Sequence, residues 1–399
     1  MKTKKQRINI HNKTNKFYSH KFGGHKFGRG FKGVVTDVCN HKKYDMNNLC
    51  RQMQKNSKDI VKITLYILNE NQPTGAASLV QPVELTTPEQ IADFIEYISS
   101  KQSNQYIAKE FYQYRIRESD FHNELNSYEP IYKSLNEMGA NLVGMPYASD
   151  LLIGIEIEYK QSAPELLQND IYMALTNIPF IRDMHEPSNK RYFVFNRKCQ
   201  QTLTLKNTRH FSPSQFDKLV VQILEILVHL ENSNIAHGDI KLDNIMICDD
   251  NYRLIDWEQG RVLDYIKIKT SISLGACPAY YILKFGNQWK AVFSLAIPFI
   301  IKVTGCNDLG HKNKCQYIYD AIDYYQEQFN SDSDEKTTFN RVRYTFDLFT
   351  FGLILYGILQ HNPFIKKSKQ FDKYRLFVNN IYKHNNAKEA LLEFESLSN

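Results

Sequence analysis

Apolar runs in the first half of the chain have the length and the β-branched content of strands. Four such runs stand out, at 59–67, 106–111, 151–159 and 191–196. Farther on, the apolar residues Phe216, Leu219, Ile223, Leu227 and Leu230 recur at intervals of three and four. This spacing predicts a helix with one buried face. The pattern therefore predicts strands before residue 200 and a long helix directly after it.

The residues ahead of this helix are typical of a helix start. Ser212 is a favourable N-cap, and Pro213 stands at the first helical position. Gln215 occupies the place where a capping box requires Glu or Gln. We therefore expect the helix to begin at Pro213 and to lead directly to His237.

Two short apolar runs, Ile245 to Ile247 and Tyr252 to Ile255, flank the polar residues 249–251. This arrangement predicts a β-hairpin. Asp239 and Asn244 precede the first strand, and Asp256 follows the second. Because a hairpin brings its outer ends together, we expect these three polar side chains to gather around one point.

These residue types suit the transfer of a phosphoryl group from a nucleotide triphosphate held by Mg²⁺. One carboxylate can take the proton of the attacking hydroxyl, while an amide and a second carboxylate hold the metal. Lys241 adds a positive charge that can neutralise the moving phosphoryl group. A plain polar turn between two buried strands would explain a lone Asp-Asn pair, but it does not explain all four residues.

A glycine-rich stretch, Phe27 to Val35, has the full pattern G-x-G-x-x-G-x-V. In dinucleotide-binding folds such glycines are followed by a helix. Here the next residues, Val34 to Cys39, are β-branched and typical of a strand. We therefore favour a strand-turn-strand loop whose backbone covers nucleotide phosphates over a dinucleotide fold or a flexible glycine-rich tail.

The spacing of His237-Gly238-Asp239 through Asn244, followed by Asp256, resembles the catalytic loop and metal-binding aspartate of the protein-kinase-like superfamily. Asp347 to Gly357 is similar to the helix whose aspartate anchors that loop in protein kinases. The spelling of the motifs resembles most the divergent serine/threonine kinases of large DNA viruses.

The resemblance implies an α+β, bilobal protein-kinase-like fold with a small β-rich N-lobe and a larger helical C-lobe. The expected division is a basic tail at 1–26, an N-lobe with insertions at 27–196, and a C-lobe at 197–399 with an insertion at about 282–340. ATP and Mg²⁺ are the implied cofactors, and a protein hydroxyl is the implied acceptor.

The resemblance also implies a role for each matching residue. Asp239 would be the catalytic base, Lys241 the partner of the γ-phosphate, and Asn244 and Asp256 the metal ligands. The cofactor-binding residues would be Gly28, Gly30, Gly33, Val35, Lys62 and Glu124.

Two lysines compete for the place that reaches the ATP phosphates. The sequence around Lys109, from Tyr106 to Phe111, is more similar to the V-A-I-K strand of kinases. Lys62 lies sooner after the glycine loop, so chain order favours it. For the helix glutamate that holds this lysine, Glu124 is preferred, because Phe121, Leu125 and Tyr128 recur around it at helical spacing. Glu118 and Glu129 remain alternatives.

Three positions depart from the usual kinase spelling. Gly238 replaces the arginine that pairs with a phosphorylated activation loop, which predicts activity without that phosphorylation. Trp257-Glu258 replaces Phe-Gly after the metal aspartate. Both departures also resemble small-molecule phosphotransferases of the aminoglycoside and choline kinase type, whereas Lys241 and the Asp347 helix favour a protein kinase. A nucleotide-binding pseudokinase scaffold is the third alternative.

Composition sets limits on this interpretation. With 399 residues, 42% of them apolar, the chain can build a substantial core. Its longest apolar run, Ala291 to Ile301, is too short to cross a bilayer. No apolar segment follows the basic N-terminus, so no signal peptide is expected. These features predict a soluble cytoplasmic protein, in the host cytoplasm or the virion if the chain is viral.

Charge and cysteine content add two further expectations. The net charge is +7, and basic residues recur from Lys2 to Lys32, with no acidic residue before Asp37. Such a tail either contacts an anionic partner or is simply solvated. The seven cysteines are odd in number, scattered and without a C-x-x-C pair. This predicts free thiols in a reducing compartment and no zinc site.

Overall fold

The structure is a computed structural model of the chain. It describes residues 42–68, 80–100, 106–111, 121–122, 124–126, 128, 152–160, 189–197, 199–256, 261–266, 276–306, 314–331 and 334–398. The basic tail, the glycine-rich stretch and most of the expected activation segment lie outside these residues.

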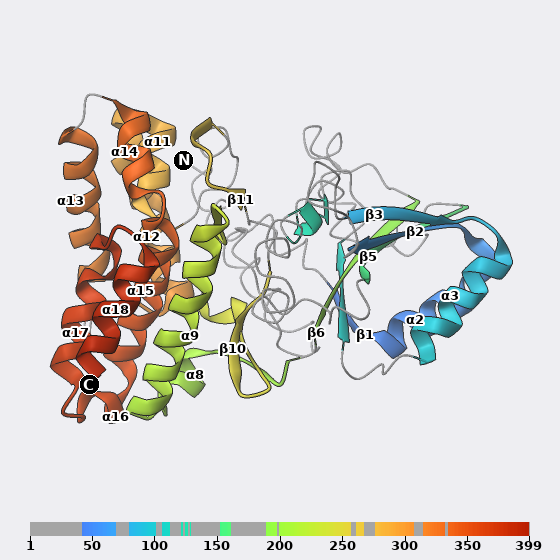
Figure 1. Ribbon diagram of the computed structural model, residues 1–399, viewed down its shortest axis with the longest axis horizontal. Helices are drawn as coiled ribbons and strands as arrows, with labels where there is room; N and C mark the ends of the chain where they lie inside the picture. Colours follow the sequence, from blue (N-terminus) through green and yellow to red (C-terminus); the bar gives the residue numbers. More distant parts are fainter. Residues whose placement is uncertain are drawn as a thin grey trace, which may run out of the picture.

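An antiparallel sheet of six strands occupies the first half of the chain (Figure 1). Its strands are β1 (Lys42–Asp45), β2 (Ile60–Leu68), β3 (Val80–Leu85), β4 (Tyr106–Phe111), β5 (Leu152–Tyr159) and β6 (Lys190–Arg197). They lie side by side in the order β1-β4-β6-β5-β2-β3. The four strands predicted from the apolar runs are therefore all present, and they are neighbours in the order β4-β6-β5-β2.

Two helices cover one face of this sheet. They are α2 (Met46–Lys55) and α3 (Pro88–Ser100), which lie next to each other in Figure 1. A short 3₁₀ helix, η2 (Ser57–Asp59), leads from α2 into β2. Met53 of α2 and Phe94 of α3 belong to one buried apolar cluster with Ile63, Ile155 and Phe193 of the sheet. The helices thus shield the apolar side chains of β2, β5 and β6 from solvent.

Helices dominate the second half of the chain, on the opposite side of the molecule in Figure 1. The α-helices are α8 (Leu205–Thr208), α9 (Pro213–Asn232), α11 (Pro278–Phe285), α12 (Trp289–Thr304), α13 (Gln316–Ser331), α14 (Glu335–Val342), α15 (Thr345–His361), α16 (Pro363–Lys366), α17 (Phe371–Asn380) and α18 (Ala387–Ser398). The 3₁₀ helices are η3 (Leu242–Asn244), η5 (Gly286–Gln288) and η6 (Ile381–Lys383). Much of the expected insertion at 282–340 is thus helical, in α12, α13 and most of α14.

The start of α9 confirms the predicted cap in detail. The Gln215 backbone N–H donates to the Ser212 side chain, and the Ser212 N–H donates back to Gln215 Oε1 at 2.9 Å. The predicted apolar stripe from Phe216 to Leu230 is buried. Because α9 ends at Asn232, it delivers the chain to β8 (Ile235–Ala236) and then directly to His237.

The predicted hairpin is also confirmed. Strands β9 (Ile245–Cys248) and β10 (Asn251–Leu254) pair antiparallel through a two-residue turn. Both turn residues, Asp249 and Asp250, have positive φ. A two-residue type I′ turn requires this, and its twist matches the twist of the two strands that it joins. Strand β7 (Gln201–Thr202) pairs with β9, and β11 (Arg261–Val262) pairs with β8.

The prediction that the cysteines are free thiols is wrong for four of them. Disulfides join Cys199 to Cys248 and Cys306 to Cys315, and only Cys50 and Cys277 are free among the described cysteines. Cys199 and Cys248 are 49 residues apart in the chain. They meet because the segment containing β7 lies beside β9, which the spacing of the cysteines does not show.

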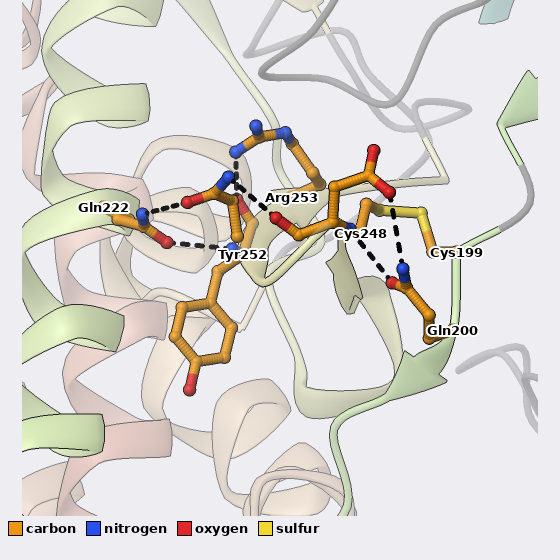
Figure 2. The surroundings of a disulfide bond; sticks show 8 residues. Cys199, Gln200, Gln222, Cys248, Tyr252 and Arg253 are labelled. Carbon is orange, nitrogen blue, oxygen red and sulfur yellow. Dashed lines mark hydrogen bonds between the residues drawn. A yellow bond between two sulfur atoms is a disulfide. The ribbon is translucent and has the colours of Figure 1, made fainter.

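The Cys199–Cys248 disulfide lies beside the β9–β10 turn (Figure 2). The Gln200 amide both accepts a hydrogen bond from the Asp249 N–H and donates to the Asp249 carboxylate. On the other strand, Gln222 of α9 accepts a hydrogen bond from the Tyr252 N–H at 2.9 Å. The hairpin is therefore attached both to α9 and to the segment that follows β6.

No single helix among the described residues is long and apolar enough to cross a membrane; α14 and α15 reach that length and hydropathy only as a pair bent by 50°.

Candidate active site

The β9–β10 hairpin brings Asp239, Asn244 and Asp256 to one end of the hairpin, as the sequence predicts. The Ile255 N–H donates to the Asn244 carbonyl at 2.9 Å, so the two outer ends of the hairpin are joined directly. Asn244 ends the short helix η3, and Asp256 follows Ile255 immediately. The local pairing of the strands thus fixes the positions of Asn244 and Asp256 relative to each other.

Asp239, Lys241 and Asn244 form one hydrogen-bonded group. Lys241 Nζ lies 2.6 Å from Asp239 Oδ2, and Asn244 Nδ2 lies 3.1 Å from the same oxygen. Asn244 Nδ2 also donates to the Asp239 carbonyl at 2.8 Å. The Asp239 side chain is 23% exposed, whereas Lys241 is buried. A partly exposed carboxylate held by two donors can accept a proton from a bound hydroxyl.

Asp347, on α15, anchors the loop that carries these residues. Its carboxylate accepts the backbone N–H of His237 at 2.6 Å and that of Gly238 at 3.0 Å. Gly238 has a φ of 77°, a conformation that glycine adopts without steric cost. The buried Asp347 therefore stabilises a turn that a residue with a side chain would adopt less readily.

The His237 imidazole connects the two sides of the hairpin. Its Nδ1 accepts the Asp239 N–H at 3.3 Å, so Nε2 carries the proton and donates to the Ile255 carbonyl at 3.1 Å. Burial lowers the pKa of His237, which keeps the ring neutral and preserves this arrangement.

Lys109 of β4 connects the sheet to the hairpin. Its ammonium group forms an ion pair with Asp256 and a second one with Glu124, at 2.8 Å. The side chains of Lys109 and Glu124 are 4% and 0% exposed. A buried charge without a partner of opposite sign would strongly destabilise the fold, so the two groups have to pair. This cluster joins the sheet to Asp256, which lies 147 residues after Lys109 in the chain.

Glu124 stands on a short helical segment, here called the Glu124 helix, whose described residues are Phe121, His122, Glu124, Leu125, Asn126 and Tyr128. The segment packs on β5 at Gly154. A Cβ at Gly154 would lie 3.1 Å from Leu125 and 3.2 Å from Phe121. The absence of a side chain there lets the helix approach the sheet closely enough for Glu124 to meet Lys109.

The expectation that Lys62 belongs to this cluster is not met. Lys62, on β2, pairs with Glu84 at 3.1 Å and with Glu158 at 3.9 Å. Three strand spacings separate β2 from β4, about 14 Å across the sheet. Chain order is misleading here, because α2, β2, β3 and α3 lie in the chain between β1 and β4, which are neighbours in the sheet. Strand β2 pairs with β5 instead. Lys109, the alternative with the V-A-I-K spelling, takes the position between Glu124 and Asp256.

Several predicted residues lie outside the part of the chain that the structure describes. They are Gly28, Gly30, Gly33 and Val35 of the glycine-rich stretch, the alternative glutamates Glu118 and Glu129, and Trp257-Glu258. Their roles stay predictions.

The site offers oxygen donors that suit Mg²⁺. Asn244 Nδ2 donates to Asp239, so its Oδ1 is the atom that can ligate a metal. The Asp256 carboxylate is 21% exposed. Within the described residues, no group of three or more His, Cys, Asp or Glu side chains could hold a metal. Two protein ligands are nevertheless enough for Mg²⁺, which usually keeps waters and binds substrate phosphates.

A family model, the protein kinase domain, matches residues 161–275 of the chain. The match includes Asp239, Lys241, Asn244 and Asp256, and it supports a place in the protein-kinase-like superfamily. No curated protein matches the chain. The antiparallel sheet and the helical majority agree with the α+β class. A kinase-type phosphoryl transfer is therefore the activity that the match supports.

Proposed function

We propose that the protein is an ATP-dependent kinase that transfers the γ-phosphoryl group to a serine or threonine hydroxyl of a protein. The observation that carries the proposal is the Glu124–Lys109–Asp256 cluster, which joins the sheet to the hairpin that carries Asp239. A buried lysine held between two carboxylates is well placed to bind phosphate oxygens beside a metal ligand.

The proposed roles follow from the contacts. Asp239 accepts the proton of the attacking hydroxyl, and Lys241, already 2.6 Å from it, neutralises charge on the phosphoryl group. Lys109 holds the phosphates of the nucleotide, in the place first assigned to Lys62. Asn244 and Asp256 hold Mg²⁺, which supplies positive charge at the phosphates when bound.

We further propose a bilobal division. Residues 27–196, with the sheet, form the N-lobe, and residues 197–399, with the hairpin and the helices, form the C-lobe. The glycines 28, 30 and 33 cover the phosphates, with Val35 beside the base. Lys241 favours a serine or threonine acceptor, by resemblance to protein kinases.

A phosphoryl-transfer assay with Asp239→Asn tests the proposal. Wild-type protein with labelled ATP and Mg²⁺ should phosphorylate itself or a general protein substrate. Loss of a general base lowers turnover roughly 10²–10⁴-fold. Asn keeps the size of the side chain, so nucleotide binding should persist, as measured by MgATP-dependent thermal stabilisation.

The same assay separates the alternatives. Wild-type protein that binds MgATP without any transfer would support a pseudokinase scaffold. Transfer to aminoglycosides, choline or sugars but not to protein would support a small-molecule phosphotransferase. An Asp239→Asn loss smaller than about threefold would remove Asp239 from the role of base.

A further inference from the structure

The carboxylate of Glu124 has a donor at each oxygen. Lys109 Nζ lies 2.8 Å from Oε2, and the Tyr128 hydroxyl donates to Oε1 at 3.1 Å. Glu124 and Tyr128 are both fully buried. A buried carboxylate stays charged only when its oxygens receive hydrogen bonds or meet opposite charge. Tyr128 therefore contributes to the charged state on which the Lys109 ion pair depends.

The two donors act from different elements. Lys109 reaches Glu124 from β4, whereas Tyr128 stands four residues after Glu124, on the same face of the Glu124 helix. The Tyr128 hydroxyl thus holds the Glu124 carboxylate in one orientation on the Glu124 helix. The Lys109 ammonium group binds this oriented carboxylate and contacts Asp256 at the same time.

We propose that Tyr128 is a positioning residue for phosphoryl transfer, because its hydroxyl holds Glu124 ionised and directed at Lys109. This inference rests on the proposed function and deepens it. Glu124 forms an ion pair with Lys109 of β4, which also pairs with Asp256 after β10. In this role Tyr128 acts through Glu124.

Tyr128→Phe removes the hydroxyl and keeps the ring. Without this donor the Glu124 carboxylate is easier to protonate, and a protonated Glu124 no longer attracts Lys109. Activity should therefore be lost at a higher pH than in the wild type as the solution is acidified. The loss of one hydrogen bond to a charged group predicts a fall in kcat/KM of roughly tenfold to a hundredfold. The acidic limb of the pH–rate profile should move to higher pH by about one to two pH units.

Tyr317→Phe is the matched control. Tyr317 is also buried, and its hydroxyl donates to the Phe349 carbonyl at the same 3.1 Å, in the helical core. This variant should lower thermal stability and leave the acidic limb in place. Equal shifts of the limb in both variants would overturn the inference.

A double variant gives a second, independent measurement. In a Glu124→Gln background no carboxylate remains to be held, so adding Tyr128→Phe should change kcat/KM by less than about threefold. Full additivity of the two losses would overturn the positioning role. If Tyr128→Phe does not fold, 3-fluorotyrosine at position 128 keeps the ring and is a stronger donor. It should move the acidic limb to lower pH, and an unmoved limb would contradict the inference.

Failure of the proposed function gives a different result. Wild-type protein that binds MgATP without transfer overturns the activity, and the Kd for MgATP then becomes the readout for the same variants. A weaker Kd in Tyr128→Phe than in Tyr317→Phe would still show that Tyr128 positions the phosphate-binding lysine. Equal values would overturn the inference.

Discussion

At the scale of single residues, Lys109 is the side chain on which the candidate site depends most. It is 4% exposed and lies between two carboxylates from different elements. Removing one member of a buried charged group leaves the others unpaired, which costs about 3–5 kcal/mol. The site and the stability of the surrounding packing are therefore linked through this residue.

Lys109→Met and Lys62→Met separate the two lysines experimentally. Methionine keeps an aliphatic stem, so each change chiefly removes the ammonium group. Lys109→Met should lower kcat/KM at least roughly a hundredfold, since Lys109 contacts both Glu124 and Asp256. Lys62, which is 26% exposed and pairs with Glu84, should tolerate the change within about threefold. Thermal unfolding should be measured for both variants, to confirm that each is folded in the assay. The reverse ranking would return the phosphate-binding role to Lys62.

The hairpin residues and the lysine differ in how well the sequence predicts their positions. Asp239, Asn244 and Asp256 are brought together by one local hairpin, so turn residues and strand runs are enough to place them. The lysine is placed by the order of strands across the sheet, which depends on contacts between segments far apart in the chain. The sequence around Ile107-Ala108-Lys109, which resembles V-A-I-K, was the local signal that favoured the lysine found between Glu124 and Asp256.

At the scale of elements, α15 occupies the centre of the helical part. Every residue from Thr345 to Leu359 is buried, including the anchor Asp347. Gly352 lies where α15 meets α13. A Cβ at this position would stand 2.0 Å from the Tyr317 hydroxyl and 2.5 Å from Ile381. Glycine is therefore required by space, although alanine is the better helix former.

Gly352→Ala should destabilise the protein by about 1–3 kcal/mol, because overpacking forces neighbouring side chains from their positions. Chemical denaturation measures the loss. In a Tyr317→Phe background the nearest atom is gone, so the same substitution should cost less. An increase in stability on Gly352→Ala would mean that α13 and α15 are farther apart than described.

Elements were predictable where their signals are local. The capping box of α9 and the β9–β10 turn depend on residues a few positions apart, and both were placed almost to the residue. Strand β2 was predicted, but helices α2 and α3 were not, because contacts with β5 and β6 hold them in place. The disulfide partners were missed for the same reason.

At the scale of the whole molecule, the Cys199–Cys248 disulfide joins the segment that follows the sheet to the hairpin of the candidate site. Both cysteines pack with Met246 and Ile255, the residue directly before Asp256. The cross-link thus holds the boundary between the sheet and the helical part at a point next to a proposed metal ligand.

Replacing Cys199 and Cys248 by serine should lower the free energy of unfolding. Chain-entropy considerations give about 4 kcal/mol for Cys199–Cys248, whose sequence separation is 49, and about 2.5 kcal/mol for Cys306–Cys315, whose separation is 9. Cys306→Ser with Cys315→Ser is therefore the control, with a smaller loss expected. Denaturation with and without a phosphine reductant measures both. Wild-type protein that is insensitive to the reductant, and carries four alkylatable thiols at these positions, would contradict the disulfides.

The strand order also has a consequence for synthesis on the ribosome. Helices α2 and α3 and strands β2 and β3 are complete once residue 100 has emerged, but their apolar side chains pack against β5 and β6, which end at Tyr159 and Arg197. At 5–20 residues per second, roughly one hundred further residues take about 5–20 s to translate. For that time the nascent chain displays Ile63, Phe94 and their neighbours without their final partners. A chaperone that binds exposed apolar segments would have a target in this part of the chain before the β9–β10 hairpin has been synthesised.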